Sequence, residues 1–103
     1  MERVALIDGV RTPFVKAAGV FSALSALDLA TEVTKGLMAR PSIADQKIDE
    51  FVFSSVLLDP RKPNLAREII LNAGLSPSIP AHFISNNCIS GLVAVSHLAG
   101  AIF

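Results

Sequence analysis

The sequence is poor in charged residues, and neither sign of charge dominates. Only 17% of its 103 residues are charged, whereas about a quarter is usual for a soluble domain. A chain with so few charges is expected to bury more surface than a small monomer can, so it either oligomerises or belongs to a longer polypeptide. Its nine basic and nine acidic residues cancel, which leaves no electrostatic case for binding nucleic acid or an anionic membrane.

The sequence also lacks long apolar runs, targeting segments and paired cysteines. No apolar run approaches the ~18 residues that a transmembrane segment needs. The first eight residues have too short an apolar run for a signal peptide and are too acidic for a transit peptide. Cys88 is the only cysteine, which excludes an internal disulfide and indicates a reducing compartment. We expect a cytoplasmic location in a bacterium, or the mitochondrial matrix if a transit peptide has been removed.

Strand-like and helix-like segments alternate along the chain. Val, Ile and aromatic content predicts three buried strands, at residues 3–7, 51–58 and 81–85. Capping residues and apolar spacing predict three helices, from Ser25 to Pro41, from Asn64 to Gly74 and from about residue 88 onwards. This βαβαβα order indicates an α/β fold with parallel strands and crossover helices.

The last predicted helix is apolar on nearly all of its sides. Its apolar residues are Ile89, Leu92, Val93, Val95, Leu98, Ala99, Ile102 and Phe103. A helix of this kind is normally buried all round, and three strands provide too few layers to cover it. We therefore expect residues 1–103 to be an incomplete part of a larger domain.

Cys88 lies where a predicted strand turns into the last predicted helix. The unpaired N–H groups and the positive dipole end at a helix start favour a thiolate, which is the nucleophilic form of cysteine. The small residues Ser90, Gly91 and Ala94 leave room for a ligand, and ligands of open α/β sheets bind beyond the carboxyl ends of the strands. The alternative is that Cys88 is an inert small hydrophobic residue.

The sequence offers Cys88 no local base. His97 follows by nine residues, about 13 Å along a helix axis, and His82 precedes by six residues, up to about 20 Å along an extended strand. We interpret both histidines as structural. One cysteine and two distant histidines do not form a metal-ligand set, so no metal site is predicted. The basic loop at residues 59–63 is interpreted as solvated surface.

Three stretches of the sequence resemble the thiolases. Residues 85–94, SNNCISGLVA, resemble the acyl-enzyme cysteine motif of that family. Residues 4–14, VALIDGVRTPF, are similar to its opening strand and Arg-Thr-Pro loop, and PNLARE at 63–68 followed by AGL at 73–75 also matches. The blocks come in the family's order and span the whole chain. The Ala-Arg-Glu and Cys-Ile-Ser segments are most similar to the β-subunit type of the fatty-acid oxidation complex.

The resemblance implies a fold, an activity and partners. Thiolases have two similar halves in αβαβα layers, with the cysteine-bearing helix buried in the middle, and this chain would form the first part of the N-terminal half. They form dimers or tetramers that cleave 3-ketoacyl-CoA with coenzyme A, or run the reverse Claisen condensation. Acyl-CoA and coenzyme A would thus be substrates, with no permanently bound cofactor. The α-subunit of a fatty-acid oxidation complex is a further implied partner.

The same resemblance gives Cys88 a role. It would carry the acyl group as a thioester, and its backbone N–H would join an oxyanion hole, a stabilisation that is usually large in acyl transfer. The family's activating histidine and second cysteine fall in later segments, so we expect this chain alone to be inactive. The alternatives are a ketoacyl synthase-like condensing enzyme, a non-catalytic thiolase-like protein, or a fragment with a purely structural or interaction role.

Overall fold

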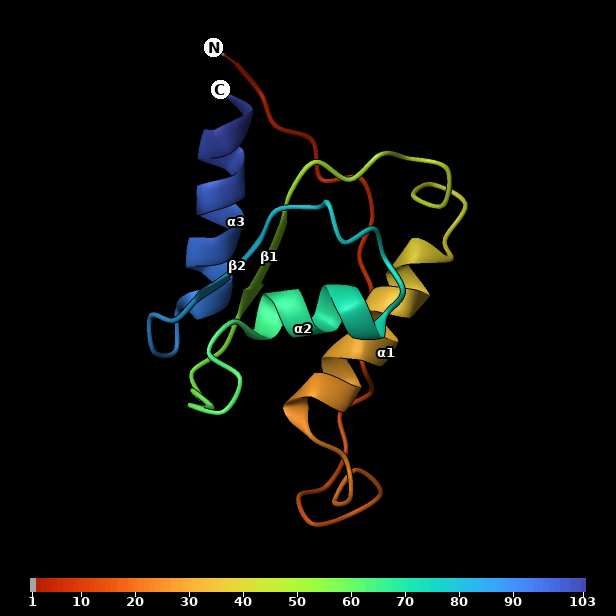
Figure 1. Cartoon of the computed structure of the whole chain (residues 1–103), viewed down its shortest axis with the longest axis vertical. Coiled ribbons are helices and arrows are strands. Elements are labelled where there is room, and N and C mark those ends of the chain that lie inside the picture. Colours follow the sequence, from red (N-terminus) through yellow and green to blue (C-terminus); the bar gives the residue numbers. More distant parts are fainter. Residues whose placement is uncertain (1) are drawn as a thin grey trace.

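The computed structural model describes residues 2–103 and has a two-stranded parallel sheet at its centre (Figure 1). Its elements are α1 (Ala26–Met38), β1 (Phe51–Ser54), α2 (Leu65–Asn72), β2 (Ala81–Ile84) and α3 (Ser90–Ile102). β1 pairs with β2 in parallel, and α2 is the crossover between them. The predicted α/β class with parallel strands is confirmed. None of the helices in the described residues is both long and apolar enough to traverse a lipid bilayer.

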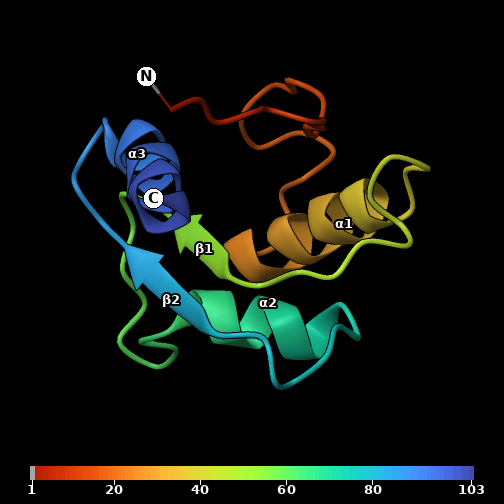
Figure 2. The ribbon, with the colours of Figure 1, turned by 90° about the horizontal axis from the view of Figure 1, so that it is seen from above.

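Helices cover both faces of the sheet. Figure 2 shows α2 against one face and α3 against the other, while α1 packs beside α2. Side chains of a strand alternate between faces, and Phe53 and Phe83 lie on the α2 side with their ring centroids 6.2 Å apart. They pack against a buried cluster of Ala30, Leu65 and Ile69. The hydrophobic core therefore lies between the sheet, α2 and α1.

The first two helices begin at the residues that the sequence predicts. Ser25 and Asp28 form a capping box, in which Ser25 Oγ accepts from the Asp28 N–H at 3.1 Å and the Asp28 carboxylate accepts from the Ser25 N–H at 2.8 Å. At α2, Asn64 Oδ1 accepts from the Arg67 N–H at 3.2 Å. The Asn64 side-chain amide also donates to the Ala81 carbonyl oxygen at 3.0 Å, which fixes the start of α2 beside β2.

The strand predicted at residues 3–7 is wrong for this structure, in which the observed order is αβαβα. Leu6 is 86% exposed and Ile7 is also exposed. Within residues 2–103, the backbone of this segment makes no hydrogen bond to β1 or β2. β propensity depends on a neighbouring strand that takes up the backbone groups and on a layer that covers the side chains. In the described part of this structure, residues 3–7 have neither a strand that pairs with them nor a layer that covers their side chains.

The second predicted strand also requires correction. β1 ends at Ser54, not at residue 58, and the following Leu57 and Leu58 are exposed beside the turn that starts at Asp59. The apolar helix α3 is not covered on all sides, as expected from the small number of layers, and its Leu92 is 70% exposed. Its covered face packs on the sheet, and no other described element packs against its opposite face.

Asp8 connects the N-terminal segment to the turn after α1. Its Oδ2 accepts hydrogen bonds from Arg40 Nε at 2.6 Å and from the Ser42 hydroxyl, and its Oδ1 accepts from the Gly9 N–H at 2.8 Å. These donors stabilise the charged carboxylate, the Ser42 hydroxyl most of all, and lower the pKa of Asp8 from 3.8 to about 2. The first residues are thus held by polar contacts and not by a sheet.

The Asp8 contacts predict a pH dependence that an NMR titration of its carboxyl group can measure. Because folding lowers the pKa, the contacts contribute their full stabilisation above pH 3.8 and lose it as the pH falls towards 2. We expect a titration midpoint of about 2. Ser42→Ala should move this midpoint up towards 3.8. A midpoint that Ser42→Ala leaves unchanged would contradict the assignment.

Candidate functional site

Cys88 lies in the turn that joins the end of β2 to the start of α3. Its side chain is exposed, and the helix begins two residues later at Ser90. The prediction that Cys88 lies near a helix N-terminus is confirmed. The residue before the helix, Ile89, supplies no side-chain cap. Of the first N–H groups of α3, that of Ser90 donates to the Asn87 carbonyl oxygen, and the positive end of the helix dipole lies at the turn that carries the cysteine.

Ser90 closes this turn. Its Oγ accepts a hydrogen bond from the Asn86 N–H at 2.7 Å, and its hydroxyl donates to the Asn87 carbonyl oxygen at 2.7 Å. The Ser90 side chain lies in the interior, because the residue is only 4% exposed. Asn87 has φ +48°, in the left-handed region that asparagine tolerates better than most residues. Ser90 and Asn87 together shape the turn so that Cys88 faces outwards.

The backbone N–H of Cys88 is available for a ligand. Within residues 2–103 it donates to no protein acceptor, whereas the next two N–H groups donate to the carbonyl oxygens of Asn86 and Asn87 at 3.2 and 3.3 Å. In the same described part of the chain, neither imidazole is hydrogen-bonded to the Cys88 thiol. The site therefore presents a thiol and a backbone donor without a neighbouring base.

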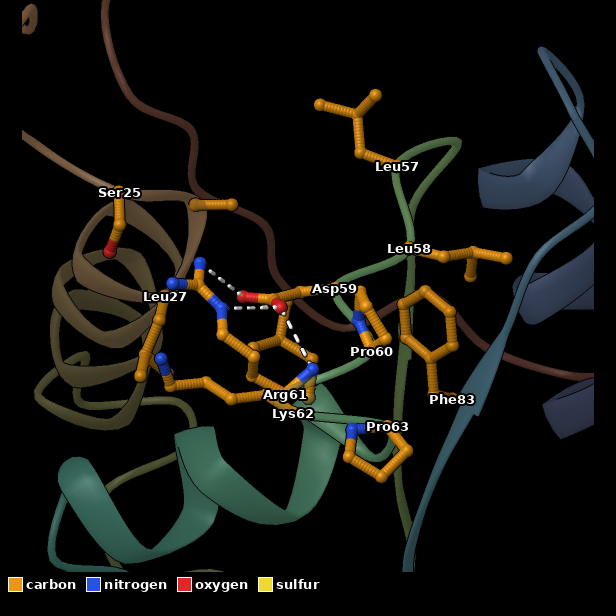
Figure 3. A pocket seen from close by; sticks show the side chains of 12 residues that line it. Ser25, Leu27, Leu57, Leu58, Asp59, Pro60, Arg61, Lys62, Pro63 and Phe83 are labelled. Atoms are coloured by element: carbon orange, nitrogen blue, oxygen red, sulfur yellow. Dashed lines mark hydrogen bonds and ion pairs between the residues drawn. The ribbon is translucent and has the colours of Figure 1, made fainter.

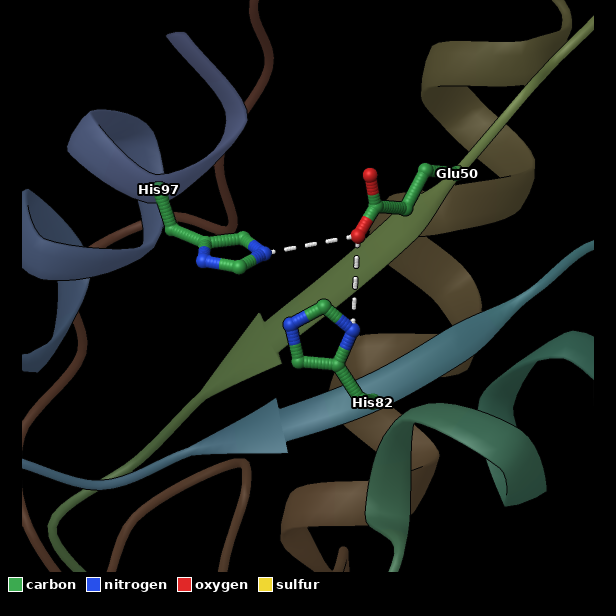
Figure 4. Close-up of side chains that lie close together, drawn as sticks. All are labelled: Glu50, His82 and His97. Atoms are coloured by element: carbon green, nitrogen blue, oxygen red, sulfur yellow. Dashed lines mark ion pairs between the residues drawn. The ribbon is translucent and has the colours of Figure 1, made fainter. Parts of the chain in front are cut away.

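The structure brings together three residues that are far apart in the sequence, Glu50, His82 and His97 (Figure 4). We call them the Glu50 cluster. Glu50 Oε1 lies 3.5 Å from His82 Nδ1 and 3.5 Å from His97 Nε2. The two imidazole rings meet edge to face with centroids 4.7 Å apart. The sequence analysis considered the two histidines only as ligands together with Cys88, whereas here they lie beside Glu50.

The parallel register explains how the Glu50 cluster forms. Val52 pairs with His82, and Glu50 precedes Val52 by the two residues that return a side chain to the same face of a strand. That face is the one on which α3 packs, and α3 carries His97. The period of two along residues 50–54 was a usable signal, but the pairing of β1 with β2 had to be known to interpret it.

A pocket of ≈ 510 Å³ lies between the start of α1, the loop at residues 57–63 and Phe83 (Figure 3). Its walls are mainly apolar. At its rim, Arg61 donates from Nε and Nη2 to the Asp59 carboxylate at 3.0 and 3.2 Å, and these bonds lower the pKa of Asp59. The Arg61 side chain is exposed, as the sequence suggested for this loop. The pocket behind it was not predicted, and Cys88 does not line it.

Comparison with known proteins identifies relatives that match nearly the whole chain. The family model described as thiolase, N-terminal domain, matches residues 4–103. Over 101 residues the chain is 39% identical to proteins named 3-ketoacyl-CoA thiolase from Yersinia enterocolitica and Photorhabdus laumondii, and 40% identical to one from Aeromonas salmonicida. Each alignment covers 98% of this chain and 23% of the relative.

A match over nearly the whole chain defines its class, and the chain belongs to the thiolase family. The resemblance inferred from the three sequence blocks is confirmed. The chain spans about a quarter of the length of the curated relatives it matches. These relatives therefore identify the family, while the activity of the whole protein is a matter for proposal.

The geometry of the cysteine turn predicts that Ser90→Ala loosens it. Loss of the two hydrogen bonds leaves the Asn86 N–H without its acceptor, at a net cost of about 1 kcal/mol for each bond. Amide hydrogen exchange should therefore become at least about fivefold faster at Asn86. Ser85→Ala is the matched control, because Ser85 is exposed and forms no hydrogen bond among the described residues. Equal exchange rates in the two variants would contradict this account of the turn.

Proposed function

We propose that this chain supplies the acyl-accepting cysteine of a thiolase that acts on 3-ketoacyl-CoA. The observation that carries the proposal is the position of Cys88, an exposed thiol at the start of α3 with an unpaired backbone N–H beside it. The name 3-ketoacyl-CoA thiolase that the relatives bear supports the substrate class. The likeness of residues 85–94 to the family's cysteine motif supports the assignment of the nucleophile.

In the proposed reaction the Cys88 thiolate attacks the 3-keto carbon of the substrate. The carbonyl oxygen becomes an oxyanion that the Cys88 N–H helps to stabilise. The bond between C2 and C3 then breaks, C2 takes up a proton, and acetyl-CoA leaves with the acyl group retained on the sulfur. The thiol of coenzyme A attacks this thioester, releases a shortened acyl-CoA and returns the cysteine. Acyl-CoA and coenzyme A are consumed as substrates, and no resident cofactor takes part.

The proton transfers in this scheme need a base that lies outside the Cys88 turn. His82 and His97 face Glu50 (Figure 4), so neither is assigned to the cysteine. We propose that the base and a second reactive cysteine come from further segments of the thiolase fold. Residues 1–103 then form the first part of its N-terminal domain.

The surface of the chain supports its place in a larger assembly. The accessible surface is 7464 Å², whereas a compact monomer of 10.9 kDa should expose about 5,600 Å². Leu92, Val95 and Ile102 contribute to the excess on the free side of α3. The proposed partners are further thiolase layers, other copies of the chain in a homodimer or homotetramer, and the α-subunit of a fatty-acid oxidation complex. An exposed free thiol fits the reducing cytoplasm.

The proposal predicts that Cys88 becomes acylated in the full-length protein. After incubation with acetoacetyl-CoA, mass spectrometry should find an acetyl group on the peptide that contains Cys88. Cys88→Ser and Cys88→Ala should both lose this adduct and lower the rate of thiolysis by at least about a thousandfold. An adduct on another residue, or thiolysis that survives both substitutions, would contradict the role of Cys88. Acylation without thiolysis by coenzyme A would favour the condensing-enzyme alternative.

A separate prediction concerns the chain by itself. We expect purified residues 1–103 to show no thiolysis of acetoacetyl-CoA, because Cys88 has no base within reach. The full-length protein assayed at the same concentration serves as the positive control. Turnover by the chain, in a preparation free of host thiolase and lost on Cys88→Ala, would overturn this expectation.

A further inference from the structure

We propose that the Glu50 cluster binds a divalent transition-metal ion, for which Zn²⁺ is the first probe. Glu50, His82 and His97 each offer one ligand atom, and these atoms all lie within 4.8 Å of one another. Figure 4 shows the carboxylate of Glu50 between the two imidazoles, with one oxygen facing both. The site involves neither Cys88 nor the acyl transfer proposed above, so it stands or falls independently of that function.

The distances in the cluster suit a shared metal better than direct hydrogen bonds. Both gaps from Glu50 Oε1 to an imidazole nitrogen are 3.5 Å, beyond the 2.7–3.2 Å that N–H···O hydrogen bonds usually span. Two ligands bound to Zn²⁺ at about 2.1 Å in tetrahedral geometry lie about 3.4 Å apart. The carboxylate oxygen therefore already has the separation from each nitrogen that a common metal requires.

The ligand chemistry is also appropriate. Two imidazole nitrogens and one carboxylate oxygen form a set that binds Zn²⁺ and related first-row ions, and the open fourth position can hold a water molecule. The side chains of Glu50, His82 and His97 are 28%, 40% and 45% exposed, which lets an ion enter from solvent. The two imidazole nitrogens lie within 4.8 Å of each other, so the rings would turn towards a shared ion as it binds.

The fold holds the three ligands in place before any ion arrives. Glu50 directly precedes β1 and His82 lies within β2, so the hydrogen-bonded pairing of these strands sets their separation. His97 comes from α3, which packs on the same face of the sheet. A bound ion would therefore link the sheet to α3, the helix that begins beside Cys88, and resist separation of the two.

Metal binding can be measured directly on the chain by titration with Zn²⁺ and by the visible absorption of Co²⁺. We expect one ion per chain and the intense absorption of tetrahedral Co²⁺. His82→Asn, His97→Asn and Glu50→Gln should each weaken binding by about tenfold or more. Cys88→Ser is a necessary control, because the thiol is exposed and could bind Zn²⁺ itself, and Glu68→Gln is a matched carboxylate outside the cluster. Both controls should bind like the unsubstituted chain.

A second measurement follows the two imidazoles themselves. The chain contains two histidines in total, so an NMR titration with Zn²⁺ reports on both imidazoles without interference, and both should shift together to an end point at one equivalent. Zn²⁺ should also raise the Tm of the unsubstituted chain and not that of His97→Asn. Binding that is lost in Cys88→Ser, or that leaves either imidazole unshifted, would overturn the proposal. The absence of saturable binding would do the same and would leave Glu50 and the histidines as an ordinary ion-pair cluster.

Discussion

The parallel pairing of β1 with β2 determines where the functional groups of this chain lie. The register sends Phe53 and Phe83 to the face covered by α2, where they complete the hydrophobic core. The opposite face receives Glu50 and His82 and is covered by α3. Because β2 runs in the same direction as β1, its carboxyl end delivers the chain to the Cys88 turn at the edge where ligands of α/β sheets usually bind. One pairing thus positions the core, the cysteine turn and the Glu50 cluster.

The parts of the fold that the sequence predicted are those with local causes. The capping box at Ser25 and the cap at Asn64 involve residues three apart, and both form as expected. The strand at residues 3–7 failed because a strand depends on a distant partner, which residues 2–103 do not place beside it. The helix α3 depends on distant elements in the same way, since apolar composition shows that a helix needs cover but not which element provides it, and within residues 2–103 its free side stays exposed.

The same distinction applies to the candidate sites. The strand–turn–helix pattern around Cys88 lies within about ten residues, so the sequence predicted the position of this cysteine beside the helix start. The Glu50 cluster joins residues that are 15 to 47 positions apart, and its formation depends on strand register and helix docking together. The pocket by Arg61 likewise combines α1, a loop and β2. Separation along the chain, more than the chemistry of the residues, decided which site could be foreseen.

The attachment of α3 links the cysteine turn to the Glu50 cluster. Only Ser90 and Ala94 of this helix are buried, so apolar packing alone holds it weakly to the sheet. His97 adds a polar contact about two turns after Ser90, and the Ser90 hydrogen bonds fix the first turn. If additional thiolase layers cover the free side of α3, the Glu50 cluster becomes less accessible to solvent. Burying its carboxylate then costs free energy unless a positive charge accompanies it. A metal ion or a protonated imidazole supplies that charge, so the Glu50 cluster becomes more dependent on its cation as the surrounding fold becomes more complete.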